Sequence, residues 1–108
     1  MYVGHMLDLS RKAVEKTKGI GRGEHDHDEN LRLALAHLIQ IIGEAARRVS
    51  ADFQRKQPDI PWAEMIGMRH KIVHDYLEID EDIVWDVVIQ DLPLIVPVLE
   101  EIIPAEGP

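Results

Sequence analysis

The segment 29-ENLRLALAHLIQIIGEAARRVSA-51 decides the fold class of this 108-residue chain. Its apolar residues recur every three or four positions, which is typical of one face of an amphipathic helix. This stripe consists of Leu31, Leu35, Leu38, Ile42, Ala45 or Ala46, and Val49. Leu33, Ile39 and Ile41 widen the stripe, so we expect this helix to contact other helices on more than one side.

A second helix is predicted on the N-terminal side, over residues 2–18. It has a similar spacing of mainly apolar residues, formed by Val3, Met6, Leu7, Ser10, Val14 and Thr17. Three glycines follow and are expected to end it: Gly19, Gly21 and Gly23. The next stretch, 24-EHDHDEN-30, is a polar connection in which Asp26 or Asp28 can cap the long helix.

On the C-terminal side, residues 52–60 are predicted to form a loop, and Pro61 suits the first position of a third helix. That helix is expected to continue through 67-GMRHKIVHDYLEID-80. Asp80 can cap a fourth helix, which carries Ile83, Val84, Val87 and Val88. Pro93 and Pro97 should interrupt it and leave a short, kinked fifth helix over residues 93–103.

These elements predict an all-α protein, an up-and-down bundle of about four helices with a short C-terminal helix, in which residues 1–108 form a single domain. The composition agrees, because 45% of residues are hydrophobic and only 5% are aromatic. No apolar run reaches the roughly 20 residues that cross a bilayer, and no secretory signal is recognisable, so a cytoplasmic protein without a membrane partner is expected. The absence of cysteine excludes disulfides, thiolate metal sites and a cysteine nucleophile.

The net charge of −8 argues at first against a protein that binds nucleic acid. However, residues 1–77 hold all 12 Lys and Arg against 11 of the 20 acidic residues, whereas the other nine acids lie in residues 78–108. The acidity is therefore a property of the C-terminal third. A weak local excess of positive charge remains around residues 44–75, with six Lys and Arg against five acidic residues.

The segment 67–80 places four polar residues in what should be a core helix: Arg69, His70, His74 and Tyr76. On a helical wheel that advances about 100° per residue, they flank and overlap an apolar stripe of Ile66, Val73 and Leu77. Burying such groups is costly unless they are paired or lie in a solvated cleft. Taken singly, each histidine can be a core or boundary residue, and Arg69 can be an ion-pair partner of Glu44 or Asp75. Glu44 can also pair with Arg47.

Taken together, RHKIVHDY fits the R-x4-H-x-Y pattern of HepT-type toxins, which are helical ribonucleases of the HEPN superfamily. The flanking segments also resemble that family in order and spacing. They are 38-LIQIIGEAARRVS-50, 58-PDIPWAEMIGMRHKIVHDYLEID-80, the pair VW at 84–85 and DLP at 91–93. The resemblance covers residues 29–94 closely and implies a HEPN-like fold.

The resemblance implies a metal-independent endoribonuclease without a cofactor. Attack of the neighbouring 2′-hydroxyl on the phosphate of the RNA substrate would give a 2′,3′-cyclic phosphate and a 5′-hydroxyl. Arg69 would bind the phosphate through its forked guanidinium, and His74 would act as acid and base, since imidazole titrates near neutral pH. His70 would orient the phosphate or supply the second proton transfer, although asparagine is common at that position in the family.

The resemblance also implies two partners. In the family, the motif helices of two subunits meet, so a homodimer would line one cleft with two copies of the motif and concentrate its positive charge. Arg47, Arg48 and Lys71 could contribute to that charge. The other partner is an MntA-type nucleotidyltransferase antitoxin, which would transfer AMP to Tyr76 and thereby block the cleft with bulk and negative charge. A tyrosine that packs at the boundary of the core is the structural alternative for Tyr76.

Two rival interpretations remain open. The first is a non-catalytic helical module that binds a nucleotide and docks a nucleotidyltransferase. The second is a metal-dependent phosphohydrolase, suggested by His74-Asp75 and by the HDHD run at residues 25–28. We expect His25 and His27 to lie in an exposed connection without converging on a metal, and His37 to be a boundary histidine. Trp62 and Trp85 are expected to be core anchors.

Overall fold

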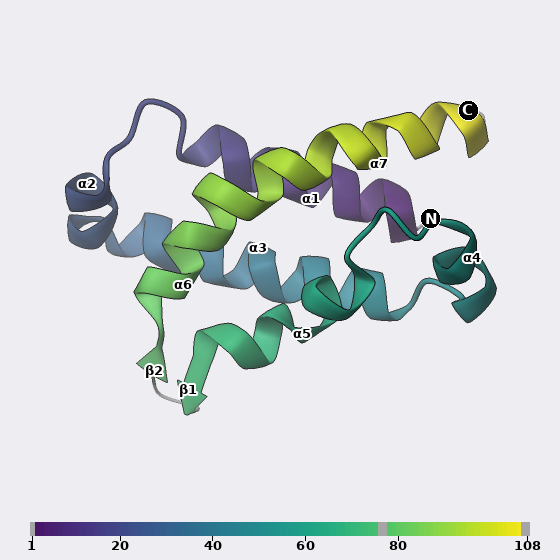
Figure 1. The fold of residues 1–108 in the computed structure, drawn as a ribbon. Coiled ribbons are helices and arrows are strands. Elements are labelled where there is room, and N and C mark those ends of the chain that lie inside the picture. Colours follow the sequence, from purple (N-terminus) through teal and green to yellow (C-terminus); the bar gives the residue numbers. More distant parts are fainter. Residues whose placement is uncertain (1, 76–77, 107–108) are drawn as a thin grey trace.

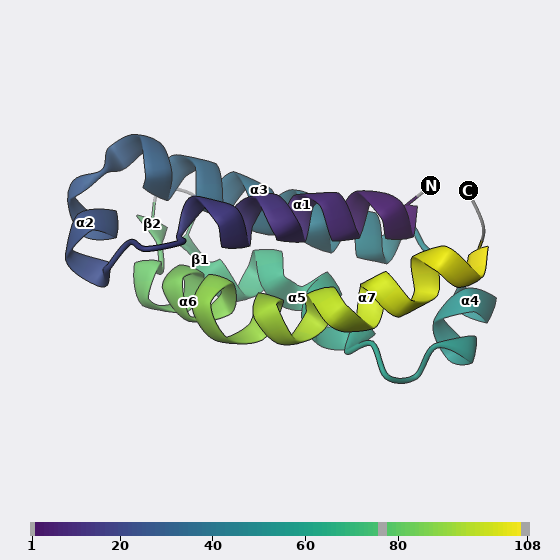
Figure 2. The same cartoon turned by 90° about the horizontal axis from the view of Figure 1, so that it is seen from above.

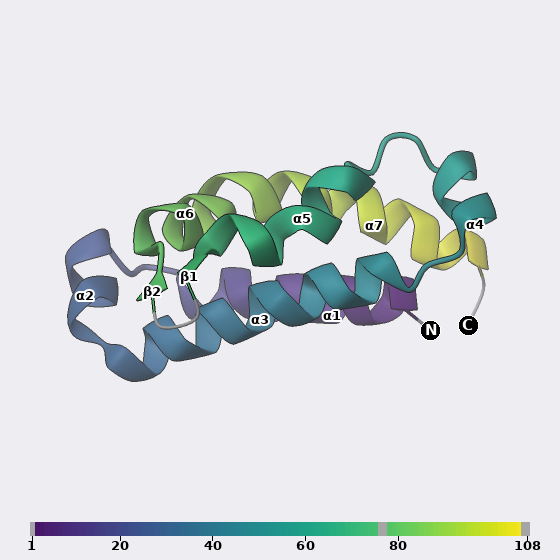
Figure 3. The same cartoon turned by 90° about the horizontal axis from the view of Figure 1, so that it is seen from below.

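Four helices form the body of the protein in the computed structural model, which describes residues 2–75 and 78–106. They are α1 (Tyr2–Lys16), α3 (Glu29–Arg47), α5 (Trp62–Ile72) and α7 (Leu92–Glu106). The turned views show α1 and α3 in one layer and α5 and α7 in the other (Figures 2 and 3). Helix α3 packs against both α1 and α5, and α1 packs against α7. The all-α bundle and the central place of the long helix are therefore confirmed.

Short elements connect these helices. They are α2 (Arg22–His27), α4 (Ala51–Lys56), β1 (Val73–Asp75), β2 (Glu78–Ile79), α6 (Glu81–Asp86) and the π-helical turn η1 (Val87–Asp91). Strands β1 and β2 are antiparallel, with Val73 opposite Ile79. Figure 1 shows this hairpin at the same end of the bundle as α2, whereas α4 lies at the opposite end, near both termini.

Several helix boundaries follow the predicted signals. Gly19 has φ 73° just after α1, as expected for a glycine that ends a helix. Of the two predicted caps for α3, Asp28 is the one used, because its carboxylate accepts a hydrogen bond from the Leu31 backbone N–H at 3.0 Å. Asp80 caps α6 in the same way, with Ile83 N–H as donor at 3.1 Å.

The prediction that two connecting stretches lack helix was wrong. The polar connection contains α2, and the loop after α3 contains α4. Each has six residues, and Ser50 caps α4 by accepting from Phe53 N–H at 3.1 Å. Helices this short carry too little apolar periodicity to be recognised, because isolated turns gain most of their stability from packing and caps.

The third helix also ends earlier than predicted. Helix α5 stops at Ile72, and the chain then turns into β1 and β2 instead of continuing through the motif. A backbone hydrogen bond of 2.6 Å from Asp80 N–H to the Ile72 carbonyl joins the residue before β1 to the residue after β2. His74 therefore lies in a strand, and the helical wheel does not apply to it. Tyr76 lies outside the described residues.

The prolines do not shorten the last helix, contrary to the prediction. Helix α7 runs for 15 residues through Pro93 and Pro97. Pro93 is its second residue and lies just after the π-helical turn η1, whose wider hydrogen-bond pattern reaches as far as Leu92. Leu92, Ile95, Leu99 and Ile102 are all buried, so packing into the core outweighs the hydrogen bond lost at Pro97.

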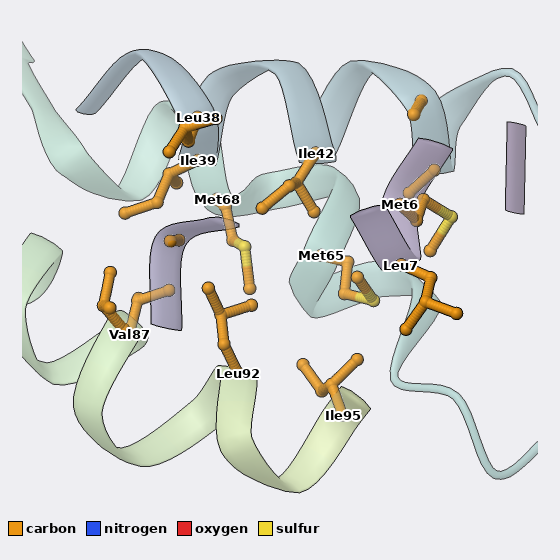
Figure 4. Packing of buried hydrophobic residues seen from close by; sticks show 14 of the residues in the cluster. Met6, Leu7, Leu38, Ile39, Ile42, Met65, Met68, Val87, Leu92 and Ile95 are labelled. Carbon is orange, nitrogen blue, oxygen red and sulfur yellow. The ribbon is translucent and has the colours of Figure 1, made fainter. Parts of the chain in front are cut away.

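The core lies between the two layers. Figure 4 shows Met6 and Leu7 from α1 together with Ile39 and Ile42 from α3, facing side chains of the other layer: Met65, Met68, Val87, Leu92 and Ile95. Trp62 is buried as expected, and its indole N–H donates to the Gln57 carbonyl at 2.9 Å. Trp85 is only partly buried.

Helices α3 and α5 approach each other closely at Gly43. A Cβ atom at this position would lie 2.9 Å from the backbone carbonyl oxygen of Met65, closer than side-chain atoms normally come. Gly67, on the facing helix, has open space around the corresponding position. The absence of a side chain at Gly43 thus sets the spacing of the two helices that frame the motif.

We expect Gly43→Ala to lower the free energy of unfolding by about 1–3 kcal/mol, because α5 must move away from α3. Gly67→Ala is the matched control. It should raise stability by up to about 1 kcal/mol, since alanine favours helix and meets no neighbour within the same chain. Urea unfolding followed by circular dichroism measures both. Equal effects of the two substitutions would contradict the close approach at Gly43.

Candidate functional site

Arg69 and His70 are exposed on the last turn of α5. The buried side of this helix is formed by Trp62, Met65, Met68 and Ile72. The predicted stripe was therefore wrong, because Ile66 and Val73 are only half-buried and Leu77 lies outside the described residues. The two polar residues face solvent on the described chain, so they incur no desolvation cost there.

Arg69 and His70 line a hollow of about 390 Å³ between α3 and α5. Its other lining residues are Gly43, Glu44 and Arg47 from α3, and Ala63, Ile66 and Gly67 from α5. A second, shallower hollow adjoins it and is lined by His37, Gln40, Ile41, Glu44, Arg47 and Arg69. Arg69 and Arg47 belong to both hollows. Two guanidinium groups thus border the same surface.

Glu44 organises the arginines of α3. One of its carboxylate oxygens, Oε1, accepts hydrogen bonds from Arg47 at 2.7 Å and from Arg48 at 3.0 Å, and the other accepts from Arg47 at 3.1 Å. These guanidinium groups lower the pKa of Glu44 to about 2. The carboxylate is therefore ionised at neutral pH, and the trio of Glu44, Arg47 and Arg48 keeps one net positive charge.

Glu44 was expected to pair with Arg69 or Arg47; it pairs with Arg47, as well as with Arg48, and not with Arg69. Arg69 forms no ion pair with any side chain that the structure describes, a set that does not include Asp75. An exposed guanidinium without a protein partner in this set retains its donors for an anion. Phosphate is the anion that its planar fork fits best.

The predicted residues beyond α5 can be placed only in part. The backbone of His74 lies in β1, two residues after the end of α5, but its side chain and that of Asp75 are not described. Tyr76 is outside the described residues. Arg69, His70 and the start of β1 are therefore near one another along the chain, while the contacts of His74 and Tyr76 remain predictions.

His37 and Gln40, on the exposed side of α3, were not assigned to the site from sequence, and Arg47 was expected only to add positive charge to the cleft. His37 is exposed and lines the hollow beside Arg69, so it is not a boundary histidine of the core. A signal was available, because residues 37, 40, 41, 44, 47 and 48 recur at helical spacing opposite the buried stripe.

A second polar cluster lies at the α2 end of the bundle. His25 is completely buried, against the expectation of an exposed connection, and its ring packs on Trp85 with centroids 5.0 Å apart. Its Nδ1 is 3.0 Å from Asp26 Oδ1, and its Nε2 is 3.6 Å from Glu81 Oε1. His27 is exposed, with Nδ1 2.8 Å from the Gly23 carbonyl. The described residues contain no cluster of three or more His, Asp or Glu able to hold a metal ion.

Burial raises the pKa of Glu81 above its ordinary value of 4.5. The carboxyl group of Glu81 therefore binds its proton more tightly in the folded state than in the unfolded state. As a result, the contribution of Glu81 to the free energy of unfolding falls as the pH rises above 4.5. We expect Glu81→Gln to raise Tm by a few degrees at neutral pH and by less as the pH approaches 4.5. Asp82→Asn, which removes an exposed carboxylate bound to Arg22, should not raise Tm. Thermal unfolding at several pH values measures both, and a gain that does not depend on pH would contradict this account.

Within the described residues, no helix is both long enough and apolar enough to cross a membrane.

The family model described as Ribonuclease HepT-like matches residues 6–102. A protein of Methanocaldococcus jannaschii that is named a putative RNase is 37% identical over 90 residues, which cover 83% of either chain. Another, from Caldanaerobacter subterraneus subsp. tengcongensis and also named a putative RNase, is 30% identical over 97% of this chain and 94% of its own length. A protein of Thermococcus cleftensis named a probable ribonuclease HepT is 39% identical over 61% of this chain and 60% of its own. No solved structure matches the chain at a significant level.

Proposed function

Because this chain belongs to the HepT-like ribonuclease family, we propose that it is an RNA endonuclease and the toxin of a toxin–antitoxin pair. The main support for this proposal is the position of Arg69. It is exposed beside a hollow, it has no ion-pair partner among the described side chains, and Arg47 lines the same surface. The substrate is RNA in the cytoplasm, and its phosphate binds to Arg69.

The reaction needs a base, an acid and a cation, and the motif contains all three. The 2′-hydroxyl gives up its proton and its oxygen attacks the adjacent phosphorus. The bond to the 5′-oxygen of the next nucleotide then breaks, and that oxygen takes up a proton. His74 transfers protons in these steps, His70 assists, and Arg69 stabilises the negative charge on the phosphate oxygens. No metal ion or cofactor takes part in these steps.

A homodimer would supply the second set of groups. Ala63, Ile66, Gly67 and His70 recur at helical spacing along the side of α5 that lines the hollow. Small residues let another helix approach closely, so this side of α5 suits contact with its copy in a second subunit. Two motifs would then line one cleft, and the two Arg69 side chains would raise its positive potential.

Cleavage of RNA by the purified protein in the presence of EDTA tests the enzymatic part. We expect fragments that end in a 2′,3′-cyclic phosphate and begin with a 5′-hydroxyl. His74→Ala should cut at least a hundredfold more slowly, because a positioned proton-transfer group typically contributes about 10²–10⁴ in rate. Expression of the wild type should arrest growth, and expression of His74→Ala should not.

Other outcomes identify the rivals. Cleavage that stops in EDTA would favour a metal-dependent phosphohydrolase. A protein that cuts no RNA but binds a nucleotide and a nucleotidyltransferase would be the non-catalytic module. Equal cleavage by wild type and His74→Ala would remove His74 from the mechanism.

Regulation would act through Tyr76. An MntA-type nucleotidyltransferase would transfer AMP from ATP to its hydroxyl, releasing pyrophosphate, and the added phosphate would repel RNA. Mass spectrometry after incubation with this partner and ATP should show the AMP on Tyr76. Tyr76→Phe should take up no AMP and should remain toxic in cells that express the partner. Modification of another residue, or of none, would remove this role.

A further inference from the structure

A third hollow, of about 440 Å³, lies between α1 and α3, on the side of Glu44 away from α5. These two helices run side by side in the turned views (Figures 2 and 3). The floor is apolar and is made by Leu9, Ile41 and Ala45. Tyr2 and His5 line it from α1, with their rings 6.3 Å apart and nearly perpendicular. Tyr2 is 42% exposed although it is a large aromatic residue.

Positive groups also line this hollow. Arg48 lies there, held by Glu44 through a hydrogen bond of 3.0 Å, and Lys12 lies there on α1. The side chains of Glu44 and Tyr2 both raise the pKa of Arg48. Asp8 and Glu44 are the acids in the lining, and Glu44 is already shared with Arg47. An aromatic ring, an apolar floor and a fixed guanidinium match the base and the phosphate of a nucleotide.

The hollow shares two lining residues with the surface around Arg69. Ile41 and Glu44 line both this hollow and the one that contains Arg69 and Arg47. Only the width of α3 separates the two, and a helix with its side chains is about 10–12 Å across. A single RNA strand whose phosphate is bound at Arg69 can therefore cross α3 and reach Arg48 and Tyr2.

We propose that the α1–α3 hollow binds a nucleotide of the single-stranded RNA that flanks the scissile phosphate, with the base on the Tyr2 ring and a phosphate at Arg48. This inference rests on the proposed ribonuclease function and extends it. It implies that the RNA substrate is single-stranded near the cleavage site, because a base must be unpaired to stack on a side chain. Tyr2 and Arg48 are binding residues here, and the reacting atoms stay at Arg69.

Binding is tested with a short single-stranded oligonucleotide that carries 2′-deoxyribose throughout and so cannot be cut by 2′-hydroxyl attack. Loss of one base stack should raise Kd about tenfold in Tyr2→Ala, whereas Tyr2→Phe keeps the ring and should stay within about twofold of wild type. Arg48→Ala should weaken binding and lower the slope of log K against log salt by about one. Leu94→Ala, which removes an apolar side chain that is 74% exposed on α7, is the matched control and should bind as wild type does.

Cleavable RNA gives a second measurement. Tyr2→Ala should raise KM about tenfold and leave kcat within about threefold, since the stack is made equally in the ground and transition states. Unchanged Kd and KM in Tyr2→Ala would overturn the inference. So would a shift of the monomer–dimer equilibrium in Tyr2→Ala on size exclusion, because the hollow would then be a contact between subunits. If the wild type cuts no RNA but binds the probe through Tyr2 and Arg48, the ribonuclease proposal fails and the nucleotide hollow stands.

Discussion

Arg69→Ala is expected to lower kcat for RNA cleavage by about 10²–10³, the loss typical of a group that stabilises charge in the transition state. Arg69→Lys should recover only part of this activity, since lysine keeps the charge but lacks the fork that holds two phosphate oxygens at once. The substituted side chain is exposed and has no ion pair among the described residues, so Tm should hardly change. Kinetics on a defined RNA together with thermal unfolding measure both.

Arg55→Ala is the matched control. Arg55 is an exposed arginine on α4, paired with Asp52, and α4 lies at the opposite end of the bundle from the hairpin (Figure 1). Its loss removes one positive charge from the chain without touching the hollows around Arg69. Cleavage by Arg55→Ala should stay within about threefold of wild type, allowing for a small long-range effect of charge on RNA binding. Equal losses in the two variants would mean that only net charge matters.

Leu35→Ala should have the largest effect on stability, a loss of about 2–5 kcal/mol in the free energy of unfolding. Leu35 on α3 is completely buried in the core, and its truncation leaves a cavity between packed helices. Domains of this size have only about 5–15 kcal/mol of net stability, so Tm should fall by at least about 10 °C. Urea and thermal unfolding followed by circular dichroism provide both values.

Leu33→Ala makes the same chemical change two residues earlier on the same helix. Leu33 is 63% exposed, so its truncation creates no cavity and should alter the free energy of unfolding by less than about 0.5 kcal/mol. Leucine and alanine also have similar helix propensities, so the comparison isolates burial. A similar loss in both variants would mean that Leu33 is covered in solution, for example by a second subunit.

The hydrophobic periodicity determined the two long N-terminal helices and their bundle, because a stripe at three- and four-residue spacing has no other efficient way to be buried. The sequence also predicted the caps at Asp28 and Asp80 and the end of α1 at Gly19, since each depends only on its neighbours along the chain. The motif residues and the family could also be recognised from sequence, because the motif is a local pattern along the chain. Arg69 and His70 could be named as candidates before any contact was known.

The apolar spacing predicted the wrong side of α5 as the one that faces the core. Ile66, Val73 and Leu77 are correctly spaced for a helical stripe, but Met65, Met68 and Ile72 form the buried one. The missing side chain at Gly43 favours the observed side, because it lets the Met65 backbone of α5 approach α3. That contact joins residues far apart in the chain, and it turns Arg69 and His70 outward to the hollow.

Tertiary contacts also decided where helices stop. The segment from Val73 to Ile79 has helical spacing, yet it pairs as a hairpin that the Asp80–Ile72 hydrogen bond closes. Helix α7 has prolines that favour a break, yet its four core residues keep it helical. Local preferences amount to about 1 kcal/mol per residue, with proline the main exception at about 3, and burial of several apolar side chains exceeds them. The sequence by itself therefore determined the helices, caps and motif of this protein. Only the packing of distant residues decided the orientation of α5, the hairpin that carries His74, and the hollows that join α1, α3 and α5.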